Sequence, residues 1–130
     1  MRGASVFVVD DDPGIVDAVT AVLEPDGYHV QGASDSREGL LAVLRDPPDL
    51  LVLDVNMPGL NGWELCDILR RQTTTVDVPV LFLTGRGEVR DQITAMQVGG
   101  NDHLRKPFRT EELRGKVRAL TARARQKGRA

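Results

Sequence analysis

The stretch 4-ASVFVVDDDPGIVDAV-19 joins a strand-like run to three consecutive aspartates and then to Pro-Gly. The run at 5–9 is almost continuously apolar, which is typical of a strand that is covered on both faces of a sheet. Two carboxylates about 4 Å apart repel each other by roughly 4 kcal/mol at an effective dielectric of about 20. The three aspartates therefore require a compensating group, and the identity of that group should indicate the function.

The rest of the chain repeats this strand-and-helix pattern. Further strand-like runs occur at 28–32, 50–54, 78–84 and 102–106. Helical apolar periods follow the runs, at Ile15, Val19, Val22 and Leu23, at Leu40, Leu41 and Leu44, at Leu65, Ile68 and Leu69, at Ile93 and Met96, and at Leu113, Val117 and Leu120. Five such units predict an α/β fold, a doubly wound, five-stranded parallel sheet with helices on both faces.

Length and composition limit the class of protein. The 130 residues suffice for one domain, and 41% apolar and 28% charged residues are ordinary for a globular protein. No apolar run approaches about 18 residues and no signal region opens the chain, so we expect no membrane segment and a cytoplasmic protein. The single cysteine, Cys66, excludes an internal disulfide framework and a zinc site built from cysteines.

Basic side chains are concentrated at the C-terminal end of the chain. Residues 109–130 carry a net charge of +6, whereas the rest of the chain carries −8. Such a basic segment can contact nucleic acid. The interpretation that we favour is an exposed face of a terminal helix that continues into the start of a linker.

Polar side chains stand at the carboxyl ends of four of the five predicted strands. Asp10 and Asp11 follow the first strand, Asp54 ends the third, Thr84 the fourth and Lys106 the fifth. Open parallel sheets bind their ligands beyond these strand ends, at the point where the strand order reverses. These side chains are therefore the candidate functional set.

The three consecutive aspartates do not share one role. Asp12 precedes Pro13, and proline is favoured at the first helical position, so Asp12 is predicted to cap a helix. Asp10 and Asp11 precede this cap, and strand pairing brings Asp54 alongside them. Three converging carboxylates suit Mg²⁺, which binds one or two carboxylates, keeps several waters and completes its shell with phosphate oxygens.

A hydroxyl and an ammonium complete a phosphoryl-binding set. Thr84 and Lys106 stand at neighbouring strand ends, where they can neutralise charge on phosphoryl oxygens together with the metal. No serine or cysteine stands at the centre of the set, so a carboxylate is the natural acceptor of the phosphoryl group. Asp54 is the candidate acceptor, because it lies between the acidic pair and the Thr84/Lys106 pair.

Four motifs, in this order, resemble the receiver domain of two-component response regulators over nearly the whole chain. The motifs are 8-VVDDDP-13, 51-LVLDVNMPGLNGWEL-65, 81-LFLTG-85 and 102-DHLRKPF-108. The resemblance implies a flavodoxin-like (βα)5 receiver fold with strand order 2-1-3-4-5. It also implies that a histidine kinase or a phosphotransfer protein phosphorylates Asp54.

The resemblance also implies a ligand set for the metal. Asp11 would bind Mg²⁺ directly and Asp10 mostly through water, and the Asp54 carboxylate would share the ion. Asn56 would contribute its backbone carbonyl.

The same resemblance implies the residues of the switch. Thr84 and Lys106 would hold the phosphoryl oxygens, Thr84 would follow the phosphate inward, and the Lys106–Pro107 bond would be cis. Gly85 stands where Ala or Ser usually follows the threonine, and His103 stands where a Tyr or Phe usually turns inward on activation. His103 is thus a switch candidate, with an ordinary surface histidine as the alternative.

Two further residues are expected to influence the lifetime of the phosphoryl group. In the family, the positions two beyond the phosphorylated Asp and two beyond the Thr flank the path of the hydrolytic water, and here they are Asn56 and Arg86. Arg86 is either a shield that holds phosphoryl oxygens or a solvated side chain.

The last predicted helix bears on partners. The run 111-EELRGKVRALTARAR-125 resembles receivers that precede winged-helix DNA-binding domains and dimerise through the fourth helix, fifth strand and fifth helix. The ion-pair positions of that face are Asp102, Glu112, Lys116 and Arg118, with Gln92 in place of the usual basic residue. We expect a receiver domain at 1–122 and a basic tail or linker start at 123–130. Nucleic acid would be contacted only through an effector domain that this sequence lacks.

Two enzymatic alternatives require motifs that the sequence lacks. A hydrolase of the haloacid dehalogenase type requires Asp-x-Asp-x-Thr/Val after the first strand, whereas here Asp-Asp-Asp-Pro ends that strand and 54-DVN-56 has no second Asp. Dinucleotide binding requires Gly-x-Gly-x-x-Gly after the first strand, and this motif is absent. A receiver-like interaction module that is never phosphorylated is the alternative, although such modules usually lack one residue of the set and this chain keeps all of them. The sequence therefore predicts a signalling switch that catalyses only its own phosphorylation and dephosphorylation.

Overall fold

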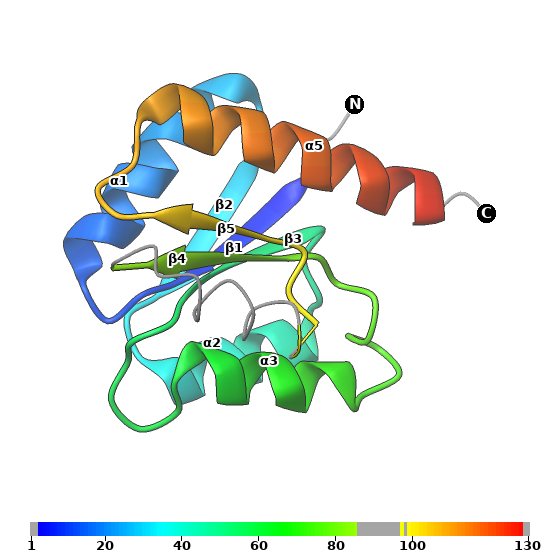
Figure 1. Ribbon diagram of the computed structural model, residues 1–130. Helices are drawn as coiled ribbons and strands as arrows, with labels where there is room; N and C mark the ends of the chain where they lie inside the picture. The colour runs from blue at the N-terminus through cyan, green and yellow to red at the C-terminus, as the bar shows by residue number, and fades with distance from the viewer. Residues whose placement is uncertain (1–2, 86–96, 98, 129–130) are drawn as a thin grey trace.

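A five-stranded parallel sheet forms the centre of the molecule. The computed structural model describes residues 3–85, 97 and 99–128. The strands are β1 (Ser5–Val9), β2 (His29–Ala33), β3 (Leu50–Asp54), β4 (Val80–Thr84) and β5 (Asp102–Arg105). Their order is β2-β1-β3-β4-β5, and every neighbouring pair is parallel (Figure 1). The predicted doubly wound fold and strand order are confirmed.

Helices cover both faces of this sheet. They are α1 (Pro13–Leu23), α2 (Ser36–Arg45), α3 (Gly62–Arg70) and α5 (Thr110–Gly128), and a short 3-10 turn, η1 (Glu24–Asp26), follows α1. Figure 1 shows α1 and α5 on one face and α2 and α3 on the other. No helix in the described part of the chain is long and apolar enough to cross a membrane. The helical period predicted at Ile93 and Met96 lies outside the described residues.

Some predicted element bounds differ from the observed ones. The fourth strand begins at Val80 rather than at residue 78, because Pro79 has no amide hydrogen and the Val80 amide donates to the Asn101 side chain. The second strand is shifted by one residue, to His29–Ala33. The fifth strand ends at Arg105, just before the cis Lys106–Pro107 bond, which was expected from the family resemblance.

Two apolar cores lie on either side of the sheet. All five residues of β3 and of β4 are buried, as their nearly unbroken apolar runs predict. One predicted core position is wrong: the Leu41 side chain is 59% exposed. The buried positions of α2 are Ser36, Gly39 and Val43, and Leu41 falls on the opposite side of that helix.

Candidate functional site

Three carboxylates meet at the carboxyl ends of β1 and β3. The pairing of Val9 with Leu53 places the next residues, Asp10 and Asp54, side by side. One carboxylate oxygen from each of Asp10, Asp11 and Asp54 lies within 4.8 Å of the other two. Asp10 is fully buried, Asp54 is 3% exposed, and Asp11 faces solvent. The predicted cluster is therefore present, with two of its members inside the protein and one at its surface.

The third consecutive aspartate turns away from this cluster. The Asp12 carboxylate accepts a hydrogen bond of 2.9 Å from the Gly14 amide and caps α1, and Pro13 occupies the first turn. The Asp12 amide donates to Asp10 Oδ1 at 3.0 Å. The capping role predicted for Asp12 is confirmed, and the turn that it makes also orients Asp10.

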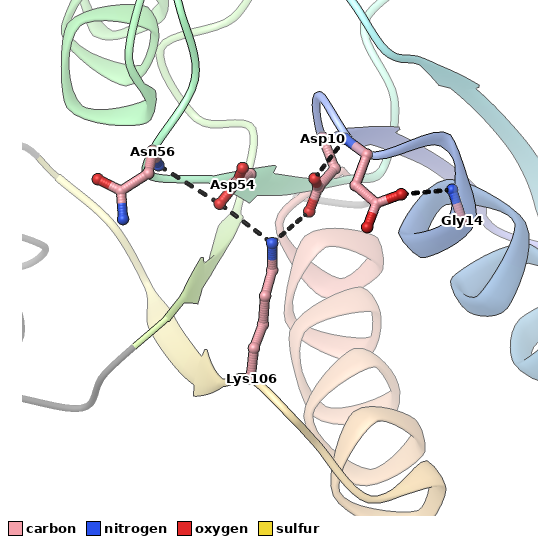
Figure 2. Close-up of polar contacts among 6 residues, drawn as sticks. Asp10, Gly14, Asp54, Asn56 and Lys106 are labelled. Atoms are coloured by element: carbon pink, nitrogen blue, oxygen red, sulfur yellow. Dashed lines mark hydrogen bonds and ion pairs between the residues drawn. The ribbon is translucent and has the colours of Figure 1, made fainter.

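One ammonium group is shared by the two buried carboxylates. Lys106 Nζ lies 2.7 Å from Asp10 Oδ2 and 3.3 Å from Asp54 Oδ1, as Figure 2 shows. The Lys106 amide donates to the Thr84 carbonyl at 2.7 Å, so the backbone after β5 remains bonded to the end of β4. Lys106 thus enters the cluster from the strand end where the sequence placed it.

Negative charge exceeds positive charge among the described residues of the cluster. Burial, and next the neighbouring Asp10 charge, raise the pKa of Asp54 from 3.8 to about 6, while Lys106 opposes this rise. Burial alone would lower the pKa of Lys106, but the contacts with Asp10 and Asp54 outweigh it and raise that pKa. Among the residues that the structure describes, only the cation of Lys106 contacts these three carboxylates, so the site favours a further positive charge.

Two buried polar atoms of the site, in Asp10 and Thr84, fit a metal ion and a phosphoryl group. Apart from the ammonium of Lys106, no donor among the described residues reaches the buried Asp10 Oδ2. The Thr84 hydroxyl is also buried and has no partner within the described ranges. It lies one residue beyond Leu83, which pairs with Asp54 across the sheet. Carboxylate oxygens are the ligands that Mg²⁺ prefers, and a hydroxyl can donate to a phosphoryl oxygen.

Comparisons with known proteins agree with this geometry. Residues 6–118 match the family described as the response regulator receiver domain. The chain belongs to this family.

Relatives and solved structures extend the likeness. The chain is 42% identical over 118 residues to the "DNA-binding dual master transcriptional regulator RpaA" of Synechocystis sp., covering 91% of this chain and 49% of that protein. It is 43% identical over 118 residues to "Response regulator MprA" of Mycobacterium leprae, covering 91% and 51%. The crystal structure of a response regulator from Chloroflexus aurantiacus superposes with a TM-score of 0.89 at 34% identity, covering 93% of this chain and 99% of that one. The receiver domain of Francisella response regulator 1452 superposes with a TM-score of 0.86 at 31% identity, and the match covers 93% of this chain and 98% of that one. The chain thus spans about half the length of the full regulators that it matches.

Of two further predicted site residues of this receiver domain, Asn56 contacts the cluster and His103 lies on β5, three residues before Lys106. The Asn56 amide donates to Asp54 Oδ1 at 3.3 Å, and its side chain is exposed. His103 pairs with Phe82 across the sheet and is half-buried, with Nδ1 3.9 Å from an oxygen of Asp102. His103 therefore sits on the strand that leads to Lys106, and its switching role stays a prediction. The predictions that concern Arg86 and Gln92 fall outside the described residues.

A glycine that sequence reasoning did not single out closes the loop after Asp54. The Gly62 amide donates to the Val55 carbonyl at 2.9 Å, at the start of α3. A Cβ atom at Gly62 would clash with the backbone carbonyl oxygen of Asp54 and lie 2.9 Å from the Val55 Cα. The pair Asn61-Gly62 was the available signal, because Asn61 forms a capping box with Glu64 and so marks the helix start.

Proposed function

We propose that this receiver domain is a phosphorylation-controlled switch in which Asp54 accepts a phosphoryl group from a phosphohistidine. One observation carries the proposal: the buried Asp54 carboxylate lies within 4.8 Å of carboxylate oxygens of Asp10 and Asp11 and 3.3 Å from the ammonium of Lys106. The alternative, an interaction module that is never phosphorylated, gives no reason for three converging carboxylates that share one ammonium, or for a Thr84 hydroxyl that is buried and has no partner among the described residues.

The transfer is a displacement at phosphorus. An Asp54 carboxylate oxygen bonds to the phosphorus atom, and the phosphorus–nitrogen bond of the phosphohistidine breaks. The electron pair of that bond returns to the imidazole nitrogen, which takes a proton from water. In the second half of the cycle, hydrolysis, a water oxygen attacks phosphorus, the bond to Asp54 breaks, and inorganic phosphate leaves.

The other site residues neutralise charge during these steps. Bound Mg²⁺ would supply positive charge to the phosphoryl oxygens. Its proposed ligands are Asp10, Asp11, Asp54 and the backbone carbonyl of Asn56. Lys106 would shift toward a phosphoryl oxygen, and the Thr84 hydroxyl would donate to another. The movement of Thr84 would then alter the environment of His103 on the adjacent strand.

Intact-mass spectrometry tests the proposal. Incubation with Mg²⁺ and acetyl phosphate should add one phosphoryl group to the wild type and none to Asp54→Asn. Asp67→Asn is the matched control, because its carboxylate is exposed on α3 and pairs with Arg71, away from the cluster. Absence of an adduct on the wild type, or the same adduct on Asp54→Asn, would refute the proposal.

The partners of the switch follow from the same proposal. A histidine kinase or phosphotransfer protein would supply the phosphoryl group, and the fourth helix, β5 and α5 would form the face for dimerisation or partner binding. On that face Lys116 Nζ pairs with Asp102 at 3.0 Å within one chain. A dimer in which either residue forms an ion pair with the second chain must therefore first break this pair. In a longer protein, nucleic acid would be contacted by an effector domain rather than by this one.

The cellular location of the protein and the boundaries of its receiver domain are also proposals. A cytoplasmic location is favoured by a single cysteine, which is buried. The proposed division into a receiver domain at 1–122 and a tail or linker at 123–130 falls inside α5, whose backbone is helical through Gly128.

A further inference from the structure

The loop between β3 and α3 carries one of the proposed metal ligands. Asn56 is its second residue, and the ends of the loop are fixed by local contacts. The Gly62 amide closes the loop onto the Val55 carbonyl, and the Met57 side chain is buried in the core. These contacts leave the middle of the loop, Pro58 to Leu60, to be held by other means.

A side chain from α2 holds this middle part. Ser36 Oγ donates to the Pro58 carbonyl at 3.3 Å and accepts from the Leu60 amide, also at 3.3 Å. Gly59, between them, has a φ of 80°, in the left-handed region that favours glycine. In the described part of the chain the Leu60 amide makes no bond to a carbonyl of its own turn, so the serine hydroxyl replaces that bond.

Ser36 is free to make these bonds because another residue caps its helix. A serine at a helix start usually accepts a bond from the first-turn amides. Here Asp35 Oδ2 accepts from the Glu38 amide at 3.0 Å and is the cap of α2. Ser36 is the first helical residue and is only 4% exposed. Its two loop partners, Pro58 and Leu60, lie 22 and 24 residues further along the chain.

We infer that Ser36 is a positioning residue for metal binding: its hydroxyl fixes the loop that presents the Asn56 carbonyl. The inference rests on the proposed function. Pro58 is exposed and water can replace a lost bond to its carbonyl, so loss of the hydroxyl should loosen the loop more than it destabilises the fold. The effect should therefore appear in Mg²⁺ affinity rather than in unfolding.

Two buried hydroxyls allow a matched comparison. Thr75 Oγ1 donates to the Leu69 carbonyl at 2.7 Å and is fully buried, just beyond the other end of α3. Thr75→Val removes this hydroxyl with little change of shape, and Ser36→Ala removes the other. Ser36→Thr keeps the hydroxyl and serves as the conservative rescue.

The experiment measures Mg²⁺ binding to the unphosphorylated protein by isothermal titration calorimetry, and unfolding by urea. We expect Ser36→Ala to weaken Mg²⁺ binding about three- to tenfold, the loss of roughly one net hydrogen bond. Ser36→Thr should bind closer to the wild type, and Thr75→Val should be less stable but bind Mg²⁺ normally.

Hydrogen exchange in metal-free protein gives a second measurement that needs no ligand. The Leu60 amide should be protected in the wild type and lose protection in Ser36→Ala but not in Thr75→Val. The inference is overturned by equal Mg²⁺ affinity of Ser36→Ala and wild type, or by an unprotected Leu60 amide in the wild type. Failure of the proposed function is distinguishable, because the wild type itself would then bind no Mg²⁺ and take up no phosphoryl group.

Discussion

Lys106 Nζ lies closer to Asp10 than to Asp54, at 2.7 Å against 3.3 Å, although Asp54 is the proposed phosphoryl acceptor. Asp10 is fully buried, whereas the Lys106 side chain is 23% exposed. In the unphosphorylated protein the ammonium therefore serves mainly to neutralise a buried carboxylate. A phosphoryl group on Asp54 would compete with Asp10 for the Lys106 ammonium.

Removal of the ammonium should consequently cost stability before any phosphate is bound. Lys106→Met removes the cation that contacts the buried Asp10 carboxylate, and we expect a loss of about 2–4 kcal/mol in urea unfolding without metal. Mg²⁺ should restore part of the loss. Lys116→Met is the control, because Lys116 pairs with the half-exposed Asp102 and such a pair is worth at most about 1 kcal/mol. Equal losses for the two variants would contradict the buried-charge argument.

The exposed member of the cluster should control the response to metal. Asp11→Ala removes a proposed direct ligand and one source of repulsion, so the metal-free melting temperature should rise and the Mg²⁺-dependent rise should disappear. In the wild type, Mg²⁺ at about 100 times its dissociation constant should stabilise by roughly 2.7 kcal/mol. Asp17→Ala removes an exposed carboxylate of α1 and should keep the full response. A full Mg²⁺ response in Asp11→Ala would place the metal elsewhere.

The raised pKa of Asp54, about 6 against 3.8, predicts a pH dependence with a definite sign. The folded state binds this proton more tightly than the unfolded state, so the stability that the neutral carboxyl gives is complete below about pH 4 and is lost as the pH rises through about 6. Asp54→Asn stays neutral at every pH. Without metal it should match the wild type near pH 4 and exceed it by about 2–3 kcal/mol at pH 7. A stability difference between Asp54→Asn and wild type that stays the same from pH 4 to pH 7 would contradict the raised pKa of Asp54.

The strand-end residues could be predicted from the sequence because their positions depend on topology alone. Parallel strands bring their carboxyl ends to one edge, so Asp10, Asp54, Thr84 and Lys106 had to approach one another once the strands were identified. The sharing of one ammonium was not predictable, since it depends on where the side chain of Lys106 reaches.

The contacts that the sequence did not reveal join segments with no periodic pattern between them. Ser36 resembles a helix cap in the sequence, and only the fold shows that it bonds to Pro58 and Leu60. Leu41 fits an apolar period, yet it lies outside because its helix buries Gly39 and Val43 instead. Local pattern predicts the elements, but it does not predict which face or loop each will contact.

A single arginine holds three segments together at the other end of the sheet. The Arg70 guanidinium donates to the Gly99 carbonyl at 2.7 and 3.0 Å and to the Val78 carbonyl at 2.7 Å. Arg70→Ala leaves these carbonyls without a donor among the described residues, and we expect a loss of about 2–3 kcal/mol in urea unfolding. Arg71→Ala is the control: its exposed pair with Asp67 should contribute less than about 0.5 kcal/mol. Equally small losses of unfolding free energy in the two variants would show that the hydrogen bonds of the Arg70 guanidinium contribute no net stability.

The same substitution at two helical glycines should have opposite effects. A Cβ atom at Gly62 would clash with the carbonyl oxygen of Asp54, whereas a Cβ atom at Gly115, in α5, would meet nothing within 4 Å. Gly115→Ala should therefore stabilise by up to about 1 kcal/mol, because alanine is the better helix former. Gly62→Ala must displace either α3 or the backbone of Asp54, so we expect a loss of about 1–3 kcal/mol.

The displacement at Gly62 should also reach the proposed chemistry. A shift of the Asp54 backbone moves its carboxylate relative to Lys106, which lies 3.3 Å away, and misplacement of reacting groups slows a reaction strongly. Phosphorylation of Gly62→Ala by acetyl phosphate should thus be slower at saturating Mg²⁺, while Gly115→Ala should react at the wild-type rate. Both variants are compared well below their unfolding midpoints, where each is fully folded. If Gly62→Ala were as stable and as reactive as Gly115→Ala, the close approach of α3 to Asp54 would have no role in placing the acceptor.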